Sequence, residues 1–439
     1  MENRKWICTE HLYLVLLSLY MFFTMAVPYS LNLIRMMLLV MVTAVSLYGC
    51  RFRIHGEGLK VMAVFLAYNG FSFLYGILRS PKGAVVEFRA EILWPVFFLA
   101  AMQLLADEKR LLNLIRVMVW IEFAISIFDF LAVACSYMHV SVPFFTEFIS
   151  LPFLQVEPGV PDVYFWFRFW HMSTHIFMIP FTIALFIMGG YDRIIKKPLM
   201  FLLLFMQGIN VFTSQRSALM AVFILAVPVS LAAGWYLAGK NRERTQIILK
   251  FFFVMFLGII LIAAFNRFLP FDFWDIIRDR IIDKIFRGKD IIAGDIRQRM
   301  HRALLRGWMG SPLTGWGMGT YTEEVQRDAV NKWFYESYYH AMLFKKGLAG
   351  VILYAVFHGW IFWKLFCMMK RNKASAVLLI PVVTGLFCML AASSEDRYLQ
   401  TLGNMWTVFI PFAIANHGKR IICADNTCSD TGQKKGVRF

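Results

Sequence analysis

Residues 11–29 and 33–50 read HLYLVLLSLYMFFTMAVPY and LIRMMLLVMVTAVSLYGC, two apolar stretches separated by three residues. A helix needs about 20 mostly apolar residues to cross a bilayer, so each stretch has the length of a membrane span. The first stretch also resembles a secretory signal peptide, because the basic residues Arg4 and Lys5 precede it. Further spans follow at once, however, and no small-x-small cleavage site closes the run. We therefore interpret it as a retained first span.

Similar stretches recur along the whole chain, and the sequence predicts about twelve spans. Their cores are 11–29, 33–50, 58–78, 91–106, 111–134, 171–190, 198–213, 216–239, 247–265, 347–369, 375–393 and 401–416. Of the 439 residues, 59% are hydrophobic and 17% are charged, whereas about 25% of a soluble domain is charged. This composition excludes a cytosolic enzyme, a coiled coil, collagen and a disordered chain. The predicted fold class is an all-α polytopic membrane protein.

The short loops predict the orientation, because cytoplasmic loops collect lysine and arginine. Basic residues such as Arg51 and Arg53 occupy alternate loops, which places both termini in the cytoplasm. The predicted organisation is nine spans over 1–265 with an outer loop at 135–170, a large and partly helical outer loop over 266–336, three spans over 337–416, and a cytoplasmic tail over 417–439. The seven cysteines form no CxxC pair, so neither a disulfide scaffold nor a zinc ribbon is indicated.

Basic residues at the outer side are candidates for binding an anion. Arg216 lies at the start of the eighth span, where helix N–H groups and a planar guanidinium both favour phosphate oxygens. The alternative is an arginine that extends to lipid headgroups. In the large loop, Arg297 is followed by Arg299, Arg302 and Arg306, which share one helical face. For these last three, a solvated face touching anionic lipid is the favoured interpretation.

Two further polar groups are predicted at the same side. Glu336 and His340 are spaced to share a helical face, so that a carboxylate and an imidazole would form a general base with its orienting partner. Tyr339 lies beside them. Glu395 and Arg397 in the last outer loop are candidates for contacting a substrate, as are Arg299 and Tyr339. The alternatives are interfacial polar residues in the first group and a solvated turn in the second.

Two carboxylates inside the fifth span favour a different class of protein, a proton-coupled transporter. Glu122 and Asp129 lie there seven residues apart, with Arg35 of the second span as a candidate partner. Against transport, most of the unusual polar residues lie at the outer interface and not at the midplane, where transporters bind substrates. His171 and His175 resemble half of a zinc site, but no third ligand is evident, so the sequence predicts no metal.

Three motifs in order resemble the membrane-embedded O-antigen polymerases and O-antigen ligases of bacteria, over roughly residues 198–416. The family carries Ser-Arg at the outer start of a span, matched here by Gln215-Arg216. It carries an arginine about fifteen residues before a Pro-x-x-Gly-x-Gly turn, matched by Arg297 and the turn 312–317. Its ligases carry a histidine eleven residues before Gly-x-x-Gly, and Glu336 occupies that position before the glycines of 347–350.

The carboxylate at the ligase histidine position favours a polymerase, with a ligase as the alternative. The resemblance implies a helical bundle of the C-type glycosyltransferase class, with its site at the periplasmic face of the bacterial inner membrane. It implies a glycan on undecaprenyl diphosphate as substrate, and a chain-length regulator and a flippase as partners beside the lipid bilayer. Inversion at the anomeric carbon, no metal, no cofactor and no nucleic acid are expected. Arg216 and Arg297 would then hold the diphosphate, and Glu336 would be the base.

Overall fold

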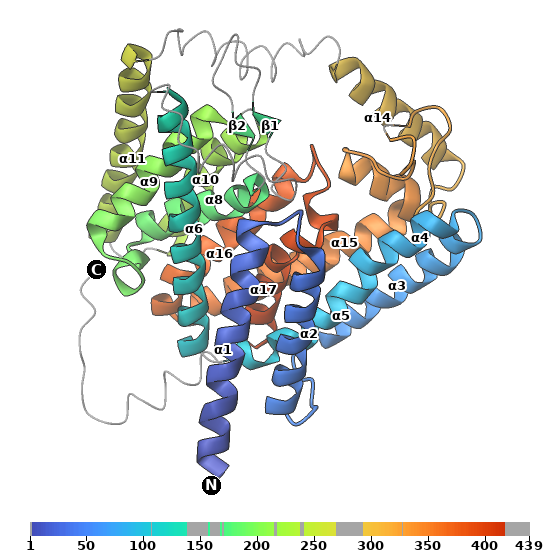
Figure 1. Ribbon diagram of the computed structural model, residues 1–439, viewed down its shortest axis with the longest axis horizontal. Coiled ribbons are helices and arrows are strands. Elements are labelled where there is room, and N and C mark those ends of the chain that lie inside the picture. Colours follow the sequence, from blue (N-terminus) through green and yellow to red (C-terminus); the bar gives the residue numbers. More distant parts are fainter. Residues whose placement is uncertain are drawn as a thin grey trace.

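The computed structural model describes residues 2–106, 108–137, 157–158, 167–168, 171–214, 217–237, 241–268, 293–326 and 328–417. Over these residues the chain is almost wholly helical (Figure 1). The two strands among them, β1 (Glu157–Pro158) and β2 (Phe167–Arg168), form one short antiparallel pair. The prediction of an all-α chain is confirmed for the described part of the molecule.

The fourteen described α-helices are α1 (Glu2–Ala26), α2 (Asn32–Gly49), α3 (Leu59–Ile77), α4 (Pro81–Phe88), α5 (Trp94–Ala101), α6 (Glu108–Tyr137), α8 (Met172–Met188), α9 (Lys197–Thr213), α10 (Ser217–Leu237), α11 (Asn241–Phe268), α14 (Ala293–Met309), α15 (Tyr338–Arg371), α16 (Lys373–Ala392) and α17 (Trp406–Asn416). Twelve of the fourteen described helices overlap a predicted span, and α4 and α14 do not. A π-helix (Arg89–Leu93) precedes α5, and 3₁₀ turns occupy Met102–Ala106, Gly190–Arg193, Tyr398–Gln400 and Leu402–Asn404.

Seven of the described helices are long and apolar enough to cross a membrane. These segments are Thr9–Ala26, Asn32–Gly49, Leu59–Ile77, Glu108–Cys135, Ala218–Tyr236, Tyr338–Arg371 and Ser375–Ala392. Three shorter apolar helices are Met172–Met188, Lys197–Val211 and Trp406–Asn416. The protein is therefore a membrane protein by the length and composition of its helices, and the count of twelve spans stays a prediction.

The predicted span over 91–106 is the one that differs most from the structure. It is divided into the end of the π-helix, the eight-residue α5 and a 3₁₀ turn. Pro95, in the first turn of α5, has no N–H to donate. Glu91 lies in the π-helix with its side chain buried. A proline and a buried charge therefore interrupt what the hydropathy of the segment predicts as one helix.

The centre of the bundle is formed by α8, which packs against α10 and α16. Every residue of α8 except Met188 is buried, and all eleven residues of α17 are buried too. A helix that is apolar on all sides is stable only when neighbours surround it. The outer helices instead expose large apolar side chains, for example Leu12 and Val15 of α1 and Leu33 and Met37 of α2. Exposed apolar surface of this extent suits contact with lipid.

The glycine-rich turn of the large loop packs tightly on the bundle. Gly315, Gly317 and Gly319 have φ values of +69°, +97° and +73°, in the left-handed region that favours glycine. The Gly317 N–H donates to the carbonyl of Lys345 at 2.8 Å. Within α15, Gly347 leaves helical geometry at φ +64° and ψ −172°. The turn satisfies backbone groups that this break frees.

Replacing Gly317 by Ala should strongly destabilise this packing. The new Cβ would overlap the backbone nitrogen of Gly76 in α3, and alanine disfavours the positive φ. We expect a loss of about 2–5 kcal/mol of folding free energy from strain and overlap together. The measurement is the melting temperature of purified protein, followed by fluorescence-detected gel filtration.

Gly359→Ala is the matched control for this substitution, because Gly359 lies in α15 with open space where a Cβ would stand. It should melt at the wild-type temperature or slightly above, since alanine favours helix. Equal melting temperatures for the two variants would contradict the tight packing of the turn.

Candidate functional site

The amphipathic helix α14 carries four of the arginines of the predicted large loop. Its buried side chains Met300, Ala303 and Leu304 recur at helical spacing. Met300 and Leu304 pack in a small apolar cluster with Tyr335 and Phe344. In Figure 1, α14 lies at the end of the molecule opposite the N-terminal end of α1.

The opposite face of α14 exposes Arg299, Arg302 and Arg306. Arg306 pairs with Glu324 at 2.8 Å, with both side chains largely in solvent. This agrees with the solvated basic face expected from the sequence.

The structure brings Arg297 and Glu336 together at the junction of α14 with the start of α15. Arg297 Nε lies 3.2 Å from Glu336 Oε2, and the two side chains are 35% and 20% exposed. Within the described part of the chain, the terminal guanidinium nitrogens of Arg297 make no hydrogen bond. The Arg297 guanidinium is therefore held in place through Nε, while its two terminal nitrogens stay available to bind an anion.

Two histidine rings lie beside this ion pair. His301, one turn after Arg297, stacks on His340 with 4.2 Å between ring centroids and 8° between ring planes. His301 Nε2 also forms a close hydrogen bond with Ser337 Oγ. We call the group Arg297, His301, Glu336, Ser337 and His340 the junction site. The sequence did not predict a role for His301 or Ser337, although the spacing of Arg297 and His301 places both on one helical face.

The surroundings of His301 favour its neutral form. Burial, the adjacent His340 ring and the Arg297 guanidinium each lower the pKa of His301 below its usual value. A neutral imidazole has one nitrogen that can accept a proton. The junction site thus contains both a carboxylate and an imidazole that could act as a base.

This lowered pKa predicts a pH-dependent stability. Below pH about 6.5 the unfolded chain binds a proton at His301 that the folded chain resists, so stability falls on acidification. We expect the melting temperature of the wild type to drop between pH 7.5 and pH 5.5, and to drop less in His301→Gln. The control is His55→Gln, at an exposed histidine of another loop, which should keep the wild-type pH dependence. An unchanged pH dependence in His301→Gln would contradict the prediction.

The prediction that Glu336 and His340 share a helical face is wrong, because Glu336 is not in the helix. The helix begins at Tyr338, with Ser337 as its N-cap residue, so Glu336 lies in the preceding loop. Gly347, the end of the predicted face, breaks the helix. Glu336 is thus positioned by the loop after Trp333 and not by helical spacing.

The other candidate residues have different surroundings. The Tyr339 hydroxyl donates to the carbonyl of Leu390 in α16 at 2.6 Å, which ties α15 to α16. Glu395 is exposed in the loop after α16. The Arg397 guanidinium covers the Phe334 ring at 3.5 Å from its centroid, and burial lowers the pKa of Arg397. Arg216 lies outside the described residues.

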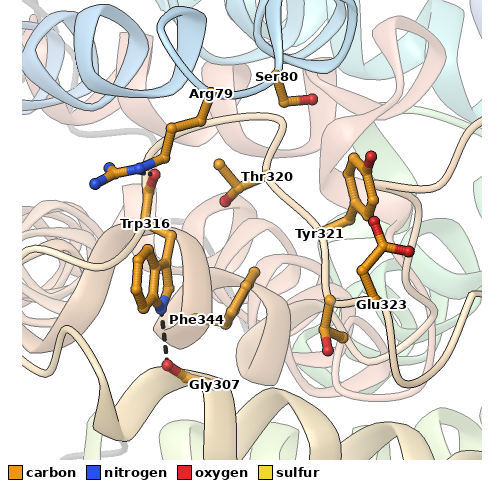
Figure 2. A pocket seen from close by; sticks show the side chains of 9 residues that line it. Arg79, Ser80, Gly307, Trp316, Thr320, Tyr321, Glu323 and Phe344 are labelled. Atoms are coloured by element: carbon orange, nitrogen blue, oxygen red, sulfur yellow. Dashed lines mark hydrogen bonds between the residues drawn. The ribbon is translucent and has the colours of Figure 1, made fainter.

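A separate cavity of about 340 Å³ lies near the other end of α14 (Figure 2). Arg79, Gly307, Trp316, Tyr321 and Phe344 contribute to its lining, which contains no residue of the junction site. The Arg79 guanidinium is held by the carbonyl of Trp316 at 3.2 Å and by the Tyr75 hydroxyl at 2.8 Å. No pattern in the sequence indicates this cavity, because its walls come from the α3–α4 connection, α14, α15, and the glycine turn with the residues that follow it.

Two buried ion pairs attach α15 to the segment around the π-helix. Lys345 pairs with Glu87, and Lys346 pairs with Glu91. All four side chains are at most 8% exposed. Neither pair was predicted from the sequence; the available signal was two adjacent lysines at the start of a span.

The pairing expected for the carboxylates of the fifth span is also wrong. Glu122 and Asp129 of α6 contact His175, and Asp129 contacts His171 as well. Arg35 instead donates to the carbonyl of Pro28 and to the Asn32 side chain. The histidines at the start of α8, and not Arg35, lie next to these carboxylates, because α8 is the central helix of the bundle.

Comparisons with family models and with curated proteins give no match to this chain. The interpretation of the junction site therefore rests on its own geometry.

Proposed function

We propose that the protein is a surface-polysaccharide polymerase of the O-antigen type. It transfers a glycan from undecaprenyl diphosphate to a hydroxyl of a lipid-linked repeat unit at the periplasmic face of the inner membrane. The observation that supports this most is the half-buried Arg297–Glu336 pair at one end of a membrane bundle. That end is opposite the N-terminal end of α1, which the loop charges assign to the cytoplasm (Figure 1).

In this proposal Arg297 binds the diphosphate of the donor. The outer nitrogens of its guanidinium match phosphate oxygens in a two-pronged geometry, and a fixed cation stabilises the negative charge that develops as the diphosphate leaves. Arg216 and Arg397 are the further cations of the proposal. Glu336 would keep its contact with Arg297 Nε, so that one guanidinium lies between the diphosphate and the carboxylate.

In the proposed reaction Glu336 acts as the base. The acceptor oxygen attacks the anomeric carbon while the bond from that carbon to the diphosphate oxygen breaks. The hydroxyl proton passes to Glu336, and the bonding electrons leave with the diphosphate. A single displacement of this kind inverts the anomeric centre. His301 and His340 position the carboxylate and the acceptor in this scheme.

The direct test is deletion of the gene in its native host, followed by a gel of the surface polysaccharide. Loss of a polymerase should leave lipid A–core carrying one repeat unit. Loss of a ligase should leave lipid A–core carrying no repeat unit at all. An unchanged ladder of chain lengths would contradict both assignments.

Arg297→Lys should lower polymer formation by about tenfold to a hundredfold. Lysine keeps the positive charge but offers a single ammonium in place of the planar fork. The measurement is the ladder restored by each variant at matched expression in the deletion strain.

The matched control is Arg302→Lys, on the exposed face of the same helix, where Arg302 hydrogen-bonds to Gln298 at 3.5 Å and to no other described residue. It should restore the full ladder. Full activity of Arg297→Lys would argue against phosphate binding at the junction site.

A further inference from the structure

A second polar cluster lies inside the bundle, between α6 and α8. His171 Nε2 lies 2.7 Å from Asp129 Oδ2, and His175 Nε2 lies 2.8 Å from the same oxygen. The donor atoms of these three residues are all within 4.8 Å of one another. All three side chains are at most 2% exposed. Two imidazole nitrogens and one carboxylate oxygen therefore converge on one point of the core.

A chain of hydrogen bonds fixes the orientation of this cluster. His175 Nδ1 lies 2.8 Å from Glu122 Oε1, which also accepts from Gln207 Nε2 at 2.7 Å. The Thr182 hydroxyl donates to Gln207 Oε1 at 2.6 Å. Histidines that bind metals usually donate their other ring nitrogen to a carboxylate, which fixes the ring and raises its basicity. Glu122 occupies that outer position on His175.

The charge of the cluster must be compensated, either by protons on the histidines or by a bound cation. Glu122 and Asp129 are fully buried, and no lysine or arginine of the described residues pairs with either. Two buried carboxylates with neutral imidazoles carry two negative charges, which is costly in an apolar bundle unless they are compensated. Glu122 Oε2 and Asn210 Oδ1 are also buried acceptors without a hydrogen-bond donor among the described residues. A divalent cation would compensate this charge.

We propose that Asp129, His171 and His175 bind one divalent transition-metal ion of the zinc class. Two imidazoles and a carboxylate are a common ligand set for zinc, and three protein ligands leave one tetrahedral position for water or an amide oxygen. Ligand atoms of a tetrahedral zinc site lie about 3.3 Å apart, so each imidazole nitrogen would move about 0.5 Å away from Asp129 Oδ2. Bound metal would fasten the start of the central helix α8 to α6.

The first test is the metal content of the full-length protein, purified through a tag without histidines. Elemental analysis should find about one zinc per chain in the wild type, and protein stripped with a chelator should take up one equivalent of Co²⁺ with the visible absorption of a tetrahedral site. Failure of the stripped wild-type protein to bind either ion in stoichiometric amount would overturn the proposal, and the cluster would then hold protons instead.

Substitutions then locate the site. Asp129→Asn and His175→Gln preserve size and should each lose the zinc and the cobalt absorption. His358→Ala is the matched control, because His358 is a buried histidine of α15 whose Nδ1 contacts the Tyr354 carbonyl at 2.9 Å. It should keep one metal per chain. Gel filtration checks the folding of each variant. Equal metal content in His175→Gln and the wild type would place the metal elsewhere and overturn the assignment.

The third test measures the melting temperature of the wild-type protein, so it does not depend on the folding of any variant. Zinc added to stripped wild-type protein should raise its melting temperature, because an ion that binds only the folded chain stabilises it. Magnesium at the same concentration should not, since it disfavours imidazole ligands. An equal rise with both ions would contradict a transition-metal site.

Discussion

Glu336→Gln is expected to reduce polymer formation by about two to four orders of magnitude, the contribution of a positioned general base. Glutamine keeps the shape of the side chain and a carbonyl oxygen that Arg297 can hydrogen-bond. It lacks the basicity to take the acceptor proton. Binding of the lipid-linked donor should therefore remain nearly intact while transfer stops. The measurement is transfer between lipid-linked repeat units by purified protein in liposomes, together with the ladder in the deletion strain.

The matched control for Glu336→Gln is Glu324→Gln. Glu324 also pairs with an arginine of α14, at 2.8 Å from Arg306, but it is exposed and distant along the helix from the junction site. It should leave transfer unchanged. Normal polymer from Glu336→Gln at wild-type expression would show that this carboxylate is not the base.

The stacked histidines offer the alternative base in that case. His340→Ala should weaken activity less than Glu336→Gln, because the proposal gives His340 a positioning role. The ring of His340 contacts His301 face to face at 4.2 Å between centroids, so protonation of one disfavours protonation of the other. If Glu336→Gln is active and His340→Ala or His301→Gln makes no polymer, the imidazole pair supplies the base.

Much of the fold could be predicted because a membrane span depends on local composition. Apolar runs of sufficient length identify helices such as α2 and α16 without knowledge of their neighbours. The same rule fails over 91–106, where Glu91 has a distant partner, Lys346. Hydropathy is evaluated for one segment at a time. It therefore cannot show that a charged residue of that segment pairs with an opposite charge on another helix.

The junction site was predictable only in part, and for a similar reason. Arg297 and Glu336 stand out through the spacing of motifs along the chain, and the structure places them in contact. His301 stands in the sequence as one residue of a basic helix. Its role becomes visible only when α14 packs on the start of α15 and brings it against His340. Likewise, the sequence around His171 and His175 shows no third candidate metal ligand, because Asp129 is on another helix.

Glu91→Gln should destabilise the fold by about 3–5 kcal/mol, the cost of removing one partner of a buried ion pair. Lys346 Nζ contacts Glu91 and, at 2.8 Å, Asn69 Oδ1. Without the carboxylate, the buried ammonium has only neutral acceptors, the amide oxygens of Asn69 and of the introduced glutamine, and no opposite charge. The start of α15 should then separate from the π-helix, with a lower melting temperature and less folded protein in fluorescence-detected gel filtration.

The double variant Glu91→Gln, Lys346→Met separates the buried charge from the lost contact. If an uncompensated ammonium causes the defect, removing it should recover most of the melting temperature, since apolar replacements of buried pairs are often tolerated. Glu57→Gln is the matched control, because Glu57 pairs with Lys364 at a partly exposed position and should cost at most about 1 kcal/mol. A double variant as unstable as Glu91→Gln would mean that the hydrogen bonds of the carboxylate, and not its charge, hold α15 in place. The position of Glu336 and His340 depends on that same end of α15, so the charge of Glu91 stabilises the junction site at a distance.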